Sequence, residues 1–148
     1  MRAVVQRVAG AQVTVEGRVI AEIGSGLLVL LGIARRDTPD DASWLLKKLL
    51  DLRIFENDLG KFDRSLRDSG GALMVVSQFT LYADTGKGRR PSFTDAAPPE
   101  MALPLYEYFV TQARAEGVHV GTGEFGAHMH VRLTNDGPVT VILDSADR

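Results

Sequence analysis

The sequence predicts a mixed α/β fold: a single domain, residues 1–148, of packed, partly barrel-like β-sheets with two main helices on the outside. Three observations support this fold class. Short segments of alternating or continuously apolar residues recur along the chain, as is typical of β-strands. Two longer segments, within residues 38–52 and 98–117, repeat apolar residues at helical spacing. No linker, low-complexity segment or internal repeat interrupts the chain, and its length suits one domain.

The N-terminal part predicts a β-hairpin followed by a buried strand. Apolar residues alternate from Val13, a turn follows at Glu16-Gly17, and the alternation resumes at Val19. A period of two on both sides of a glycine-containing turn indicates two paired strands. Residues 27–31 are then apolar without interruption, which favours a strand buried on both faces.

The first helix is predicted to begin after Thr38. A threonine suits the N-cap position, and Pro39 suits the first helical position because its missing N–H would have no partner there. Leu45, Leu49 and Leu52 then form one apolar stripe.

A second helix is predicted within residues 98–117. Gly117 supplies a C-terminal stop. Pro104 is awkward inside that span, so we expect the helix either to begin there or to be kinked near its start. Its buried face is expected to hold three apolar residues at helical spacing: Leu105, Phe109 and Ala113.

The segment Leu73–Tyr82 is predicted to be a strand that leaves the core. Both of its faces are apolar up to Val76, and polar groups follow at Ser77, Gln78 and Thr80. A strand that acquires hydroxyl and amide groups at its end can form the wall of a pocket. The alternative is that these polar side chains simply face solvent.

A hydroxyl nucleophile is not supported by the sequence alone. Ser77 or Thr80 would need an adjacent base, and the sequence does not show which of the three histidines, if any, lies nearby. No G-x-S-x-G motif is present either.

His128 and His130 lie two residues apart, which would place them on one face of a strand and could suit a metal ion. No H-E-x-x-H motif and no third ligand accompany them. Two histidines on a hydrated strand face are the alternative interpretation.

The loop of residues 85–93 places Lys87, Arg89 and Arg90 among glycines and a proline, with no acidic residue between them. Three cations with close backbone approach could bind phosphates. A solvated loop is the alternative, and no Walker-type phosphate loop is present.

The segment "NDGPVT", residues 135–140, places Gly137-Pro138 between two apolar alternating stretches. The pair therefore falls in what resembles the middle of a sheet. Asn-Asp-Gly is also ordinary turn chemistry, so a trans proline that ends a hairpin turn is the alternative. The sequence does not assign the isomer of this bond.

Composition restricts the possible partners. The formal net charge is −2, so a nucleic acid would have to be held by a local basic patch. The absence of cysteine excludes disulfides, thiolate zinc sites and a cysteine nucleophile, and is compatible with a cytoplasmic location. The N-terminus does not resemble a signal peptide or anchor, and the uncharged run at residues 70–83 is shorter than the roughly 20 residues of a membrane span.

Three separated segments resemble the motifs of the D-aminoacyl-tRNA deacylase family: "VSQFTL" at 76–81, "GRRPSF" at 88–93 and "NDGPVT" at 135–140. Five further segments are similar to that family in the same order along the chain, so the resemblance covers essentially the whole sequence. They are "VQRV", "GLLVLLG", "LRIF", "LYEYF" and "TGEFGA".

The resemblance implies an enzyme that hydrolyses the ester between a D-amino acid and the terminal adenosine of tRNA. Glycyl-tRNA mischarged on tRNA-Ala is also expected to be a substrate, whereas L-aminoacyl esters are spared. The implied enzyme is a cytoplasmic homodimer with tRNA as its partner, without a cofactor, a metal, DNA or a membrane. Gly137-Pro138 is implied to be cis and to enter the active site of the other subunit, where two carbonyl oxygens capture the amino group and exclude an L side chain.

The resemblance also implies roles for other residues. The backbone amides of Phe79 and Thr80 would stabilise the oxyanion, beside Ser77 and Gln78. Water, assisted by the ribose 2′-hydroxyl, would attack the ester, and Thr80 as a direct nucleophile is the alternative. Further implied contacts are Met129 and Ala102 with the substrate, and Lys87, Arg89 and Arg90 with tRNA phosphates.

Two other classes of function are compatible with parts of the sequence. A non-catalytic RNA- or DNA-binding module could keep the same fold, but it would have no reason to keep "SQFTL" together with "GPVT". A metal hydrolase could use His128 and His130, and it would lose activity on chelation.

Overall fold

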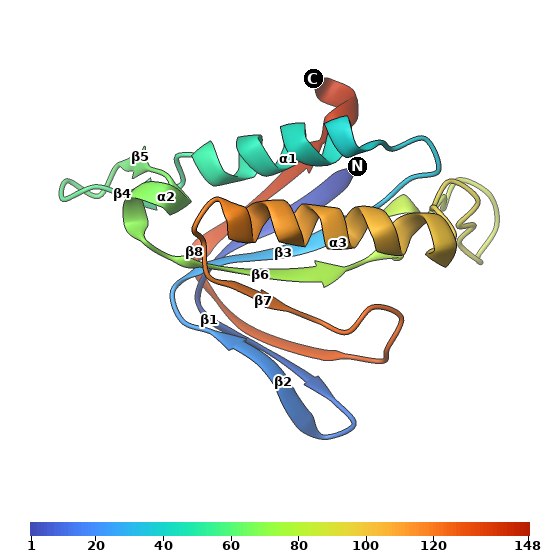
Figure 1. The fold of residues 1–148 in the computed structure, drawn as a ribbon, viewed down its shortest axis with the longest axis horizontal. Coiled ribbons are helices and arrows are strands. Elements are labelled where there is room, and N and C mark those ends of the chain that lie inside the picture. Colours follow the sequence, from blue (N-terminus) through green and yellow to red (C-terminus); the bar gives the residue numbers. More distant parts are fainter.

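A long strand, β1 (Arg2–Val15), organises the sheet in the computed structural model, which describes all 148 residues. The strand order is β2-β1-β3-β6-β7, and β8 pairs with β1. The first half of β1 lies between β3 and β8, and its second half lies between β2 and β8, so the sheet curls into a nearly closed, barrel-like shape (Figure 1). The other five strands of this sheet are β2 (Arg18–Ile23), β3 (Gly26–Gly32), β6 (Ala72–Ser77), β7 (Val120–Thr122) and β8 (His130–Asp144).

Two main helices cover one face of the sheet, as predicted (Figure 1). They are α1 (Pro39–Asp51) and α3 (Pro99–Ala115). The smaller elements lie at the ends of the sheet: β4 (Phe55–Glu56), β5 (Phe62–Arg64), α2 (Leu66–Ser69), and the 3₁₀ helices η1 (Phe79–Tyr82) and η2 (Ser145–Asp147). No helix is both long enough and apolar enough to cross a membrane.

The hairpin and the first helix follow local sequence signals. Glu16 and Gly17 both have positive φ, 49° and 76°, and connect β1 to β2 in a two-residue turn. Thr38 caps α1, with its backbone N–H donating to Asp41 Oδ2 at 2.9 Å in a capping box. Both predictions are confirmed.

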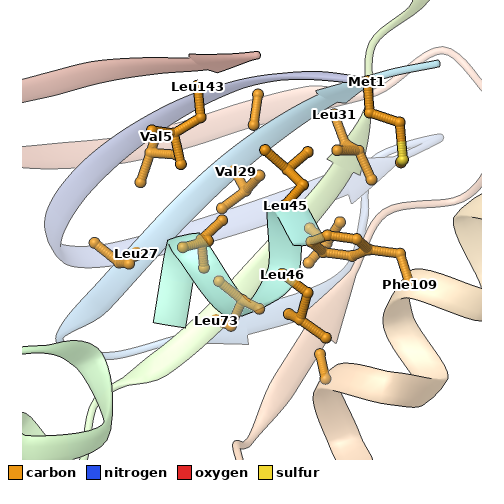
Figure 2. Packing of buried hydrophobic residues seen from close by; sticks show 14 of the residues in the cluster. Met1, Val5, Leu27, Val29, Leu31, Leu45, Leu46, Leu73, Phe109 and Leu143 are labelled. Atoms are coloured by element: carbon orange, nitrogen blue, oxygen red, sulfur yellow. The ribbon is translucent and has the colours of Figure 1, made fainter. Parts of the chain in front are cut away.

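The core has one layer on each face of the central strands. Under the helices, leucines of α1 and Phe109 of α3 pack on β3, β6 and β1 (Figure 2). A smaller cluster, which includes Val13, Leu28 and Met74, fills the concave side of the curled sheet. β3 is thereby buried on both faces, as predicted from its continuous apolar run.

One sequence prediction about the end of an element is wrong. β6 ends at Ser77 and does not continue to Tyr82: after a last hydrogen bond to β3, from Gln78 N to Leu31 O at 2.8 Å, the chain turns into η1. Phe79 and Leu81 continued the period of two in the sequence although they belong to a 3₁₀ turn. Of the two alternatives for the second helix, a start at Pro104 is removed, because α3 begins at Pro99 and contains Pro104 in its second turn.

Candidate active site

A cavity of about 580 Å³ opens at the C-terminal ends of the parallel strands β3 and β6. Leu31 and Ser77, which are partners in the register of these strands, both line it. Twelve of its nineteen lining residues are hydrophobic, so the cavity suits a ligand with a substantial apolar surface. The N-terminal end of α3 and the loop before β8 supply the remaining walls.

The segment 77–80 forms one edge of this cavity. Ser77, Gln78 and Phe79 line it, and the Gln78 amide contacts the Thr80 hydroxyl. The first hydrogen-bond donor within η1 is Leu81, whose N–H donates to Gln78 O. The backbone amides of Phe79 and Thr80 therefore have no partner within this turn, as is general at the start of a helical turn.

Gly32 lets this edge approach the sheet closely. A Cβ at this position would lie 3.0 Å from Leu81 Cβ and 3.1 Å from Gln78 O. A side chain at Gly32 would therefore push the 3₁₀ turn away from β3.

The substrate-pocket residues expected from the sequence lie on the other walls. Ala102 of α3 and Met129 both line the cavity. Gly123 makes room for Met129, since a Cβ there would lie 2.5 Å from the Met129 sulfur. Phe79 is 57% exposed, and its ring meets that of Phe93 in a T-shaped contact with centroids 5.1 Å apart.

The segment 135–140 is a bulge within one continuous strand, and it is not a hairpin turn. Gln6 pairs with Thr140 and Val8 with Asn135, so the four residues Asp136–Val139 lie opposite the single residue Arg7. The Gly137-Pro138 peptide bond within it is cis, as the resemblance implies.

Arg7 holds this bulge in place. Its side chain is buried, 7% exposed, and its Nε donates to the carbonyl oxygen of Asp136 at 2.9 Å. Nη1 donates to Ile54 O at 2.8 Å, and Nη2 pairs with Glu56 at 3.3 Å. On the other side of the bulge, Val139 N donates to Asn135 Oδ1 at 2.8 Å.

The bulge and the cavity lie at opposite ends of β3 in one chain. Val8, which pairs with Asn135 of the bulge, also pairs with Gly26 at the start of β3. Along β3 the cavity begins at Leu31, five residues further on, or roughly 16 Å at the usual rise of a β-strand. Along β8 its lining residue is Val131, four residues before Asn135. Neither Gly137 nor Pro138 lines the cavity, and both are exposed.

The basic loop, residues 85–93, lies at the N-terminal end of α3 (Figure 1). Lys87, Arg89 and Arg90 are exposed and make no ion pair, so their charges are free for an anionic ligand. None of the three lines the cavity itself.

The two histidines are not on one face of a strand. His128 precedes β8, whose first residue is His130, because the loop after β7 returns to the sheet only at that point. Their rings are adjacent, with centroids 5.1 Å apart, and both residues are exposed. No third acidic, histidine or cysteine side chain joins them in a cluster that could hold a metal.

Phe93 and Arg35 are among the cavity residues that were not expected from the sequence. Phe93 lies within the "GRRPSF" motif, which could have marked it as an aromatic wall. Arg35 follows β3, and its Nε donates to Thr94 O at 2.8 Å. No local pattern signals Arg35, because its place depends on a contact between distant segments.

Comparison with known proteins matches the sequence of this chain to one protein family. The family model described as D-Tyr-tRNA(Tyr) deacylase matches residues 4–144. A D-aminoacyl-tRNA deacylase of Roseiflexus castenholzii is 61% identical over 99% of this chain and 93% of the relative. A protein of the same description from Thermus aquaticus is 58% identical over 100% of this chain and 97% of the relative.

Two solved structures share the fold. One, named c-Myc DNA Unwinding Element Binding Protein, has a TM-score of 0.92 and 43% identity, covering 97% of this chain and 98% of its own. The other, described as a probable eukaryotic D-amino acid tRNA deacylase, has a TM-score of 0.83 at 20% identity, covering 96% and 97% of the two chains. The second likeness concerns the fold alone.

Proposed function

The chain belongs to the D-Tyr-tRNA(Tyr) deacylase family and is a D-aminoacyl-tRNA deacylase, and from this premise we propose how its cavity performs the reaction and selects the D enantiomer. The observation that carries the proposal is the position of the "SQFT" segment, residues 77–80, beside a mostly apolar cavity at the ends of β3 and β6.

The ester of the terminal adenosine lies in this cavity, with Met129 and Ala102 against the substrate. The amides of Phe79 and Thr80 donate hydrogen bonds to the oxyanion that forms when water attacks the ester carbonyl. Preorganised amides in a water-poor site stabilise such a charge strongly. The ribose 2′-hydroxyl of the substrate assists the water, so neither Ser77 nor Thr80 acts as a nucleophile. Ser77 and Gln78 shape the site.

The active enzyme is a homodimer in which Gly137 and Pro138 of one subunit enter the cavity of the other. Two observations support this arrangement. Within one chain the bulge is exposed and neither Gly137 nor Pro138 lines the cavity, so the bulge is free to complete the site of a second copy. Large apolar side chains near the bulge are also exposed, namely Phe62 (56%) and Ile142 (67%), and a dimer contact would cover them.

In that position the bulge excludes an L side chain by clash and leaves a D side chain free to point outward. Glycine has no side chain to exclude, so glycyl-tRNA mischarged on tRNA-Ala is also a substrate. Lys87, Arg89 and Arg90 contact tRNA phosphates. The enzyme thereby removes wrongly charged esters from tRNA in the cytoplasm, as a step of translational proofreading.

The experiment is to incubate the protein with D-tyrosyl-tRNA and L-tyrosyl-tRNA under the same conditions and measure the free amino acid. We expect rapid release of D-tyrosine and no release of L-tyrosine above the spontaneous rate. A protein that binds both substrates without releasing D-tyrosine would instead be a nucleic-acid-binding module.

A further inference from the structure

A second cavity, of about 320 Å³, adjoins the candidate active site. Three arginines, Arg2, Arg35 and Arg36, line it together with Tyr82. Arg35 lines both cavities, so the two cavities meet at this side chain. Its volume lies within the usual range of sites for small ligands, about 300–1,000 Å³.

The arginines of this cavity retain free donors. Arg36 has no ion pair and no side-chain hydrogen bond, and Arg35 uses only its Nε, toward Thr94 O. Arg7, by contrast, is fully engaged by the bulge, Ile54 and Glu56. Unpaired guanidinium groups at a cavity are typical of sites that bind phosphate.

The backbone that carries these groups is held firmly. Ala34 and Ala96 form an antiparallel bridge, and Arg35 N donates to Asp95 O at 3.2 Å. Arg2 is fixed by Asp144 at 3.0 Å and by Leu81 O at 2.9 Å, and its guanidinium lies 4.9 Å from the centre of the Tyr82 ring. The cavity is therefore formed before any ligand arrives.

The same cavity holds one free carboxylate. Asp84 already accepts the backbone N–H of Gly86 at 2.8 Å, whereas the side chain of Asp95 accepts no hydrogen bond. A carboxylate near bound phosphate suits a base with an exocyclic amino group, since aspartate accepts from the amino group of cytosine.

We propose that this second cavity binds the penultimate nucleotide of the tRNA 3′ end, with Arg35 and Arg36 on its phosphodiester and Asp95 on the amino group of its base. The proposal rests on the proposed function, because the terminal adenosine must occupy the first cavity for its neighbour to reach the second. Arg35, at the junction, lies where the phosphate between the two nucleotides would pass.

The test compares two substrates that differ only in this nucleotide: the D-tyrosyl ester of adenosine and the D-tyrosyl ester of the dinucleotide CpA. For the wild type we expect a KM about tenfold lower for the dinucleotide, with a similar kcat. Arg36→Gln should remove most of that gain and leave the nucleoside ester unaffected, since Arg36 does not line the first cavity. Lys48→Gln, an exposed change of equal charge on α1, is the matched control.

Salt dependence gives a second readout. Log KM for the dinucleotide should rise with log salt with a slope of about 0.7 for each phosphate contact on a single strand, and this slope should fall clearly in Arg36→Gln. Replacing cytosine by uracil should raise KM in the wild type but not in Asp95→Ala. Equal values for CpA and UpA in the wild type would remove Asp95 from the proposal.

Two results distinguish a failure of the nucleotide-site proposal from a failure of the proposed function. If the wild type hydrolyses both esters with the same KM, or if Arg36→Gln raises both KM values equally, the second cavity is not a nucleotide site although the deacylase function stands. If the wild type releases no D-tyrosine from either ester or from D-tyrosyl-tRNA, the proposed function itself fails.

Discussion

Arg7 Nε donates a hydrogen bond of 2.9 Å to the carbonyl oxygen of Asp136, and so joins the middle of β1 to the four-residue bulge of β8. The same guanidinium binds Ile54 O and Glu56, so one buried side chain connects the bulge to the segment around β4. Residues 129 positions apart in the sequence thereby fix where Gly137 and Pro138 protrude.

Arg7→Lys should lower both stability and chiral discrimination. Lysine keeps the charge but cannot reach Asp136 O, Ile54 O and Glu56 together, so we expect a loss of about 2–4 kcal/mol in unfolding free energy. The displaced bulge should also lower the ratio of D- to L-tyrosyl-tRNA hydrolysis. Arg67→Lys, which removes a guanidinium bound by two exposed carboxylates, is the control and should leave that ratio unchanged. An unaltered ratio in a folded Arg7→Lys protein would show that Arg7 does not position the bulge for selection.

Gly32→Ala should lower kcat by about tenfold to a hundredfold, because displacement of catalytic groups by about 1 Å can cost that much. The added Cβ would meet Leu81 Cβ at 3.0 Å and push the amides of Phe79 and Thr80 out of position. Gly24→Ala places its Cβ in open space and is the matched control. The measurement is kcat for D-tyrosyl-tRNA in the wild type and both variants. A normal kcat in Gly32→Ala would argue against oxyanion stabilisation by these amides.

Neutralising Lys87, Arg89 and Arg90 together, each to Gln, should raise KM for D-tyrosyl-tRNA without lowering kcat. The salt dependence of KM should weaken by a slope of about 0.9 for each duplex phosphate that these side chains neutralise in the wild type. A triple variant of exposed cations on the helices, Lys47→Gln/Lys48→Gln/Arg114→Gln, controls for net charge. If both triple variants behave like the wild type, the loop is simply solvated.

Acid should destabilise the protein partly through Asp144. Burial opposes ionisation of this carboxyl, but the Ala146 amide and the Arg2 guanidinium outweigh it and lower the pKa of Asp144. Because the unfolded carboxyl, with a pKa of about 3.9, binds its proton first, the stabilisation is present above that pH and is lost as pH falls through the lower folded value. In urea titrations between neutral and acidic pH, the free energy of unfolding of Asp144→Asn should fall less steeply with decreasing pH than that of the wild type. If the free energy of unfolding fell equally steeply in the variant and the wild type, carboxyl groups other than Asp144 would account for the loss of stability in acid.

Chelation should leave hydrolysis of D-tyrosyl-tRNA unchanged, since no cluster of three ligating side chains surrounds His128 and His130. The check is activity after exhaustive dialysis against a chelator. Loss of activity that zinc restores would favour a metal hydrolase.

Local signals were enough to predict much of the fold. The turn at Glu16-Gly17, the cap at Thr38 and the buried run in β3 depend on residues close in sequence, and the structure confirms each one. The end of β6 could not be predicted in this way, because it depends on Leu31 and Gly32 of a neighbouring strand.

The candidate site was also predictable only in part: residues within a motif could be found from the sequence, and residues placed by contacts with distant segments could not. Ser77, Gln78 and Phe79 were found through a motif, and the cavity brings them together with Ala102 and Met129. Arg7 and Arg35 carried no local signal, since an arginine in a strand or after one resembles any surface cation. Their roles depend on contacts across the fold with Asp136 and Thr94.

Mixing two defective subunits measures most directly whether each site is completed by the other chain. Gln78→Ala/Phe79→Ala alters only the cavity, and Gly137→Ala alters only the bulge, where an added Cβ would lie 2.7 Å from Val139 N. In a mixed dimer, the cavity of the Gly137→Ala subunit would receive an intact bulge from its partner. We therefore expect unfolding and refolding the two variants together to restore D-selective hydrolysis of tyrosyl-tRNA. Activity that never exceeds the sum of the two separate variants would contradict a bulge that acts across subunits.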